Sequence, residues 1–385
     1  MINVAGDERK SRDARHRLIA WGVTLSIVGL LPLRAVLGPP HMLADWLTFY
    51  SAGRLAGTHA LSDPSLFRAF QHTHGIQTTA TAIFPYPPAV AYAYAPGSHL
   101  SIFASFYVNA VVMLACAAGA GLAGARIFNL PASLGIVASL AWAPIGDAVT
   151  IGQNAPLGVL LATLAIGGLA AQRPLLTAIP IGLLLYKPTF ALPLLGLLLI
   201  RRRWRECVVV VAMAAVWYLL SVAATGGDSA WPLHQARAIA AYYRADALFN
   251  AHQTLSLPSL VQSIGAPLPL AIGSAVALLA LALPGLTRQG ATEAGAAACM
   301  IGLAISPHAY AYDAVMLLPM LLLLVAQAPE PLRTRAAFVI YLLPAIPYVG
   351  TWLRLLAVIV LGLAAAWIWK RSLGPLLAPR AGAGA

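Results

Sequence analysis

The chain has 385 residues, of which 60% are hydrophobic and 9% are charged, whereas soluble domains carry about 25% charged residues. Its mean hydropathy is +0.80. This composition excludes an ordinary soluble globular protein, a disordered chain and a coiled coil. The formal charge of +12 does not indicate a nucleic-acid partner, because the basic residues of a membrane protein gather on the cytoplasmic side of the bilayer and fix its orientation.

The N-terminal segment, residues 1–17, is polar and basic, and we expect it to stay in the cytoplasm. Leu18 to Leu37 forms the first apolar stretch of the roughly 20 residues that a bilayer requires. It is too long for the core of a signal peptide, and no small-residue cleavage site follows it. The next stretch, residues 38–88, is polar for this chain and is predicted to form an extracytoplasmic loop.

Further apolar stretches predict membrane spans along most of the chain. The Lys187-Pro188 pair divides residues 174–200 into two short helices, and such irregular backbone is tolerated only inside protein or beside a water-lined cavity. Counting this pair, the sequence predicts about twelve membrane segments. The other spans are expected at Leu100–Ala125, Leu130–Val149, Pro156–Ala171, Cys207–Ala224, Pro267–Leu286, Ala294–Ile305, Asp313–Ala326, Ala336–Val349 and Leu355–Trp369.

The predicted fold class is therefore an all-α polytopic membrane protein with a single transmembrane domain over residues 18–370. A second extracytoplasmic loop is expected at 225–263 and a cytoplasmic tail at 371–385. The charges agree with this layout, because only seven of the 24 Lys and Arg residues fall on the predicted outer side. The pattern is typical of a multi-pass protein of a bacterial-type plasma membrane with a cytoplasmic N-terminus.

Most of the aspartates and histidines fall at or near the predicted outer face, whereas all four glutamates fall on the cytoplasmic side. Side chains that can perform acid–base chemistry therefore gather at one face of the membrane. The alternative is that the outer loops are simply longer, because loops collect polar residues in general.

Motifs for nucleotide binding and for soluble hydrolase chemistry are absent from the sequence: it has no Walker loop, Rossmann glycine fingerprint, HExxH or GxSxG. A chain without a nucleotide site must use an activated substrate or a gradient. The spans are nearly free of charge, which argues against ion-coupled transport. No acidic pair with ligand spacing stands at the outer face, and the three cysteines lie inside apolar runs, so we expect no metal and no other cofactor.

Asp45 follows the first span in the segment His41-Met-Leu-Ala-Asp45-Trp46-Leu-Thr-Phe-Tyr50. Trp46, Phe49 and Tyr50 have the spacing of one helix face, which predicts a helix lying on the membrane surface. An aspartate at the start of such a helix is either a reactive carboxylate or only the N-cap of that helix.

Seven short blocks of sequence lie in a fixed order along the chain. They are Tyr50-Ser-Ala-Gly53-Arg54, Leu61-Ser-Asp63-Pro64, Phe84-Pro85-Tyr86-Pro87-Pro88, Gly152-Gln153-Asn154-Ala-Pro156, Leu185-Tyr186-Lys187-Pro188, Arg201-Arg-Arg-Trp204-Arg205, and Ser306-Pro307-His308 ahead of Asp313. From about Leu18 to Ala326 the chain resembles glycosyltransferase family 87. Its members are membrane enzymes of the GT-C fold, and they include the mycobacterial polyprenyl-phosphate-mannose-dependent α-1,2-mannosyltransferases.

The resemblance implies a GT-C-like helical bundle that transfers a sugar from a polyprenyl-phosphate donor at the extracytoplasmic face, with inversion at the anomeric carbon. The catalytic base of the family, an aspartate after the first span, corresponds to Asp45. The Lys-Pro and Ser-Pro blocks of the family correspond to Lys187-Pro188 and Ser306-Pro307. Many GT-C enzymes have a second acid directly after the first. Trp46 takes that place here, so a two-acid or metal-bridged site is not expected.

Inverting transfer from such a donor needs one carboxylate, which removes the proton of the acceptor hydroxyl while that oxygen attacks C1. The leaving phosphate is already a good anion and needs no general acid, in contrast to glycoside hydrolysis. Its developing charge does need a cation. Lys187 is the first candidate for that cation, and Arg244 and Arg54 are weaker ones. The alternatives are a snorkelling lysine and contacts with lipid headgroups.

Further polar residues are candidates for contacts with the sugar or the acceptor. Each has an ordinary structural alternative, such as a loop amide, a helix cap or a satisfied core histidine. The candidates are Tyr86, Gln153, Asn154, His252, Gln253, His308 and Asp313. The expected partners are a polyprenyl-phosphate-linked sugar, a glycolipid or glycan acceptor and the membrane lipid. The residues do not identify the sugar, and mannose is the best-known donor sugar of the family that the chain resembles.

Two other functions fit the composition. A transporter or lipid flippase would move its substrate without forming a covalent product, and it would tolerate substitution of Asp45. A membrane O-acyltransferase would need an intramembrane histidine and an acyl donor, for which His308 alone is thin support. The sequence therefore favours a membrane glycosyltransferase with Asp45 as the general base.

Overall fold

The computed structural model describes residues 44–74, 83–249, 255–263, 265–307 and 309–327. Every regular element within these ranges is a helix, which confirms the all-α class for them. The predicted first span, Leu18–Leu37, and the last two, Ala336–Val349 and Leu355–Trp369, lie outside the described residues.

Most predicted spans within the described ranges correspond to a helix whose ends are shifted by a few residues. At Leu130–Val149, however, the structure has two helices bent by 52°, where the sequence predicts one span. The described elements, in chain order, are α2 (Ala44–Leu55), η1 (His59–Leu61), α3 (Pro64–Thr73), α4 (Val90–Ser98), α5 (Ile102–Ile127), α6 (Ala132–Leu140), α7 (Ala143–Ile151), α8 (Ala155–Ala170), α9 (Pro174–Leu183), η2 (Leu184–Tyr186), α10 (Pro188–Ile200), α11 (Trp204–Ala224), α12 (Trp231–Phe249), α13 (Leu257–Ser263), α14 (Leu268–Arg288), α15 (Ala291–Ile305), η4 (Ala311–Leu317) and α16 (Leu318–Gln327).

Among the described helices, α5, α11 and α14 are long and apolar enough to cross a membrane, and the bent pair α6–α7 adds a fourth span if it counts as one. Large apolar side chains on these helices are open to the surroundings: Val111, Val208 and Leu281 are 61%, 68% and 62% exposed. Extended apolar faces of this kind are covered by hydrocarbon rather than by water. The protein is therefore a membrane protein, while the count of about twelve segments remains a prediction.

The break predicted at Lys187-Pro188 is confirmed. The short helix η2 ends at Tyr186, and α10 begins with Pro188 at its first position, where the missing N–H of proline costs no hydrogen bond. Lys187 between them has non-helical backbone angles (φ −130°, ψ 84°). The break therefore sits inside the protein. Because the backbone of Lys187 is not helical, its side chain does not follow the regular spacing of the two flanking helices.

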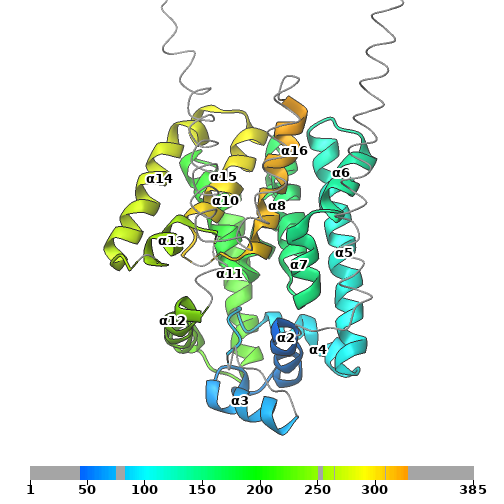
Figure 1. Cartoon of the computed structure of the whole chain (residues 1–385), viewed down its shortest axis with the longest axis vertical. Coiled ribbons are helices and arrows are strands. Elements are labelled where there is room, and N and C mark those ends of the chain that lie inside the picture. Colours follow the sequence, from blue (N-terminus) through cyan, green and yellow to red (C-terminus); the bar gives the residue numbers. More distant parts are fainter. Residues whose placement is uncertain (1–43, 75–82, 250–254, 264, 308, 328–385) are drawn as a thin grey trace, which may run out of the picture.

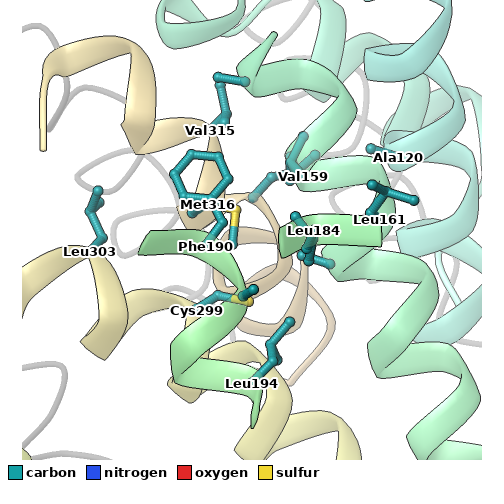
Figure 2. Close-up of a cluster of buried hydrophobic side chains, with 14 of the residues drawn as sticks. Ala120, Val159, Leu161, Leu184, Phe190, Leu194, Cys299, Leu303, Val315 and Met316 are labelled. Atoms are coloured by element: carbon teal, nitrogen blue, oxygen red, sulfur yellow. The ribbon is translucent and has the colours of Figure 1, made fainter. Parts of the chain in front are cut away.

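The core lies where α8, α10, α15 and η4 meet (Figure 2). Val159 of α8 packs there with Phe190 of α10 and Met316 of η4, and all three are buried. Cys299 of α15 belongs to the same cluster, as expected of a small core residue. Because α10 follows Lys187 and η4 contains Asp313, this packing fixes the two elements that carry those charged side chains.

The contact between α5 and α6 depends on two facing glycines. A Cβ placed on Gly135 would lie 2.2 Å from the carbonyl oxygen of Gly121. We predict that Gly135→Val lowers the free energy of unfolding by about 1–3 kcal/mol, because a backbone oxygen can make room only if the helices separate. Thermal unfolding in detergent measures this change. The control is Gly196→Val, because a Cβ at Gly196 meets no atom within 4 Å; equal unfolding temperatures for the two variants would contradict the prediction.

The helices α2, α3, α4 and α12 gather at one end of the molecule (Figure 1). The helix predicted after the first span is present as α2, but its apolar face does not lie on the membrane surface. Trp46 and Phe49 are buried inside the protein. Gly53 lets α2 approach α4, since a Cβ there would lie 2.7 Å from the carbonyl oxygen of Tyr94. The physical reason for the difference is that an apolar helix face indicates that it is covered, not whether protein or lipid covers it.

Candidate active site

A chain of hydrogen bonds ends on the carboxylate of Asp45. Gln153 donates from Nε2 to Oδ2 of Asp45 over 2.8 Å, and the hydroxyl of Tyr86 donates to Oε1 of Gln153, also over 2.8 Å. Because Oε1 accepts the tyrosine proton, the amide nitrogen of Gln153 is the group left to face Asp45. We refer to these three residues as the Tyr86–Gln153–Asp45 chain.

The turn after α7 places Gln153 opposite Asp45. Gly152 has a left-handed backbone conformation (φ +80°), which glycine adopts without strain at the end of a helix. A Cβ at Gly152 would lie 2.6 Å from the Cβ of Trp46, so a residue with a side chain would push this turn away from α2. Gly152 thereby allows the hydrogen bond between Gln153 and Asp45, which are 108 positions apart in the sequence.

The segment before α4 presents Tyr86. Gln235 of α12 donates its side-chain amide to the carbonyl oxygens of Phe84 and Tyr86 and so ties this segment to α12. Burial raises the pKa of Tyr86 well above its usual value, and the charges of Asp45 and Asp313 add to that increase. The hydroxyl therefore keeps its proton at neutral pH and acts as the donor in its hydrogen bond.

Lys187 forms an ion pair with Asp313 of η4, with 2.5 Å between Nζ and Oδ1. The other carboxylate oxygen accepts the backbone N–H of Tyr310 over 3.0 Å. The ammonium group also lies 4.5 Å from the ring centre of Phe190 and 5.1 Å from that of Tyr312, so cation–π contacts add to the ion pair. The side chains of Lys187 and Asp313 are 12% and 4% exposed, so each buried charge depends on the other.

The ion pair and the Tyr86–Gln153–Asp45 chain lie in one neighbourhood, because the charges of Asp45 and Asp313 both act on Tyr86. Tyr86, Gln153 and Asp313 are buried, whereas Asp45 is partly exposed. Of these four side chains, Asp45 is thus the one that a substrate can reach directly. A reachable carboxylate near a buried cation suits a reaction in which one group loses a proton and another leaves as an anion.

The region from residue 84 to residue 325 matches the family model of glycosyltransferase family 87. This match covers more than half of the 385 residues. The chain belongs to this family. It is therefore a glycosyltransferase, an enzyme that moves a sugar from a donor to an acceptor. Searches of the curated proteins and of the solved structures found no match.

The part of this family 87 glycosyltransferase that matches the family model contains Tyr86, Gln153, Lys187 and Asp313, but it begins after Asp45. The match therefore supports sugar transfer by this chain without covering the carboxylate itself. Asp45 is a candidate site residue instead because its carboxylate is accessible and accepts a hydrogen bond from Gln153.

The other predicted site residues make different contacts or lie outside the described residues. Asn154 donates from Nδ2 to the hydroxyl of Tyr94 over 3.4 Å. Arg54 is exposed in the last turn of α2, 3.4 Å from Nδ1 of His99, and nine residues of helix put it about 14 Å from Asp45. Arg244 belongs to α12, but its side chain is not among the described ones, and His252, Gln253 and His308 lie outside the described residues.

Sequence reasoning missed two contributors to this glycosyltransferase site. Gln235 holds the carbonyl groups of Phe84 and Tyr86, and no motif marks it. Tyr312 lies beside the ammonium group of Lys187, and only its position next to Asp313 could have drawn notice. The sequence also treats Lys187 and Asp313 as separate substrate contacts, whereas the structure pairs them.

Among the residues that the structure describes, no group of three or more His, Cys, Asp or Glu side chains could hold a metal ion. Among the described residues, Asp45 accepts a hydrogen bond from the amide of Gln153, and Asp313 pairs with the ammonium group of Lys187. The expectation that the enzyme uses no metal and no other cofactor stays a prediction.

Proposed function

We propose that this enzyme transfers a hexose from a polyprenyl-phosphate donor to a lipid or glycan acceptor at the extracytoplasmic face, with inversion and with Asp45 as the general base. Mannose is the first sugar to test. The observation that carries the proposal is the accessible carboxylate of Asp45, held by the uncharged donor Gln153 in a membrane glycosyltransferase. The absence of a nucleotide-binding loop from the sequence agrees with a lipid-linked donor.

The proposed reaction is a single displacement. Asp45 accepts the proton of one acceptor hydroxyl as that oxygen forms its bond to C1 of the donor sugar. The bond between C1 and the phosphate oxygen breaks on the opposite face, and its electron pair leaves with polyprenyl phosphate. One displacement inverts the configuration at C1. The hydrogen bond from Gln153 keeps one carboxylate oxygen in place through an uncharged donor.

The departing phosphate is proposed to be stabilised by Lys187. An ammonium group has three N–H donors, and the hydrogen bond to Asp313 uses one of them. Lys187 can therefore bind a phosphate oxygen while it remains paired. Asp313 and the backbone at Tyr310 hold the lysine in advance, which spares the cost of ordering a long side chain when charge develops on the phosphate.

The decisive experiment measures product formation in proteoliposomes. The purified enzyme is supplied with polyprenyl-phosphate mannose and a set of lipid and oligosaccharide acceptors, and products are identified by mass spectrometry. NMR then reports the configuration of the new linkage, which we expect to be opposite to that of the donor. Transfer from a nucleotide sugar alone, retention of configuration, or movement of the lipid across the bilayer without any covalent product would overturn the proposal.

The hydrogen bond to Asp45 leads to a pH-dependent prediction. In Gln153→Leu the ionised carboxylate loses a donor, and a charge-assisted hydrogen bond is worth about 1.5–3 kcal/mol. We therefore expect the acidic limb of the kcat profile to move to higher pH, so that the loss of activity is greatest at low pH. The measurement is kcat against pH at saturating donor and acceptor.

Tyr50→Phe is the matched control for this experiment. Tyr50 also lies on α2, and its hydroxyl donates to the carbonyl oxygen of Leu100, away from Asp45. Its removal should leave the profile where it is in the wild type. An equal loss of activity for Gln153→Leu at every pH would show that Gln153 only supports the fold.

A further inference from the structure

An open groove lies between the η1–α3 segment and α12, at the end of the molecule that also carries α2 (Figure 1). Its volume is about 750 Å³, within the range of small-molecule sites, about 300–1,000 Å³. Polar and charged side chains line it together with an apolar patch. They are His59, Asp63, Leu66, Asp228, His234 and Arg237, and we call this feature the α3–α12 groove.

Both acids of the groove are held in place by the helices that they precede. Oδ1 of Asp63 accepts the backbone N–H of Ser65 over 2.8 Å and that of Leu66 over 3.2 Å. Asp228 accepts the N–H of Ala230 over 2.9 Å. The Ser65 hydroxyl and the Leu66 N–H also lower the pKa of Asp63. Asp63 is therefore ionised at neutral pH, and its Oδ2 can accept a hydrogen bond from a ligand hydroxyl.

One wall of the groove is tied by backbone contacts to the segment that precedes α12. The N–H of Gly57, before η1, donates to the carbonyl oxygen of Ala224 at the end of α11 over 2.7 Å. Gly226 packs against His59, since a Cβ there would lie 3.3 Å from the His59 nitrogen. These contacts hold the η1 segment against the turn that leads from α11 into α12.

One face of α12 carries the donors of the groove. His234 and Arg237 are three residues apart and point to the same side of the helix. Nδ1 of His234 lies 2.9 Å from Oδ2 of Asp228. Arg237 is exposed, and within the described residues its guanidinium group takes part in no ion pair. It is thus available to a ligand.

The same helix connects the groove to the candidate active site. Gln235, next to His234, holds the segment that contains Tyr86. The reactive carboxylate is at the opposite end of α2 from the groove: Asp45 lies in the first turn, and His59 follows the last turn. Ten residues of helix from Asp45 to Leu55 span about 15 Å. A ligand that occupies the groove and reaches Asp45 must therefore be extended.

We propose that the α3–α12 groove binds the sugar residues of a glycan acceptor that lie beyond the residue being glycosylated. This inference rests on the proposed function. Carboxylates accept hydrogen bonds from sugar hydroxyls, the guanidinium group donates them, and the 49% exposed side chain of Leu66 offers an apolar surface to a pyranose face. Two carboxylates line the groove beside one guanidinium group, and these carboxylates disfavour the phosphate of the donor.

The test compares acceptors of different length. Alkyl mannosides of one to five sugar residues are offered to the wild type and to Arg237→Ala with polyprenyl-phosphate mannose as donor. We expect KM for the longest acceptor to rise about tenfold in the variant, because a charge-assisted hydrogen bond is lost. The kcat/KM for the monosaccharide and KM for the donor should not change. Arg68→Ala is the control, since Arg68 is exposed on α3 and does not line the groove.

A direct binding measurement separates this inference from the proposed function. Calorimetry with the five-residue mannoside and with inorganic phosphate needs no turnover. Weaker mannoside binding by Arg237→Ala supports the groove assignment even if the wild type transfers no sugar. Three results would overturn it: equal losses for short and long acceptors, no mannoside binding by the wild type, or a loss of phosphate binding in place of mannoside binding.

Discussion

Replacement of Asp45 by asparagine is expected to lower kcat by a factor of about 10²–10⁴, the usual contribution of a general base. Asparagine has the same shape, and its Oδ1 can still accept the hydrogen bond that Gln153 donates to the aspartate. The variant should therefore fold, enter the membrane and bind the donor as the wild type does. The measurement is initial-rate kinetics with polyprenyl-phosphate mannose, with donor affinity determined separately.

Asp147→Asn is the matched control, because it removes one carboxylate from α7, close in sequence to Gln153, at a position with no assigned part in the reaction. It should retain nearly full kcat. Wild-type turnover by Asp45→Asn would show that another group accepts the proton. Loss of protein from the membrane fraction would show instead that Asp45 serves mainly to stabilise the first turn of α2.

Replacement of Lys187 by methionine should produce the largest loss of stability. Methionine fills a similar volume but leaves Asp313, whose side chain is 4% exposed, without its counter-charge. Breaking a buried ion pair in this way costs about 3–5 kcal/mol. We expect a lower unfolding temperature in detergent and a loss of donor affinity, because the proposed phosphate ligand is removed at the same time. Thermal unfolding and binding of polyprenyl phosphate measure the two effects.

A double variant separates the two roles of Lys187. In Lys187→Met with Asp313→Asn the buried charge is gone, and an asparagine oxygen can still accept the N–H of Tyr310. Stability should recover most of the loss, whereas donor binding should stay weak. Recovery of both properties would show that the lysine only neutralises Asp313. Recovery of neither would show that the pair is needed to form the break between η2 and α10.

The class of protein and several local features were predictable from the sequence because they depend on neighbouring residues. Long apolar stretches without charge must form helices in lipid, where backbone groups have no water to pair with. The Lys187-Pro188 pair favours a helix break, because proline disfavours helical backbone at the residue before it and fits the first position of the next helix, and α10 begins there. The helix from Ala44 was expected from the spacing of its aromatic residues. These features can be predicted without knowing which helices pack against one another.

The composition of the candidate site was not predictable in the same way, because it depends on which segments meet. Gln153 and Asp45 are 108 residues apart, and Lys187 and Asp313 are 126 residues apart. The spacing of residues along the sequence does not predict that residues so far apart will come into contact. The sequence suggests Gln153 as a substrate contact, but a polar residue after a helix can also bind another side chain. Only the packed turn at Gly152, against α2, gives it the carboxylate of Asp45 as a partner.

The sequence by itself determined that this protein is a helical membrane protein, that its chain breaks at Lys187, and that Asp45 stands at the start of a helix. The tertiary structure alone decided that Asp45 meets Gln153, that Lys187 is neutralised by Asp313, and that α12 lies between the groove and Tyr86. The reason is physical: backbone hydrogen bonding and hydrophobic length act over one helix, whereas a buried polar side chain finds its partner only when distant helices have packed.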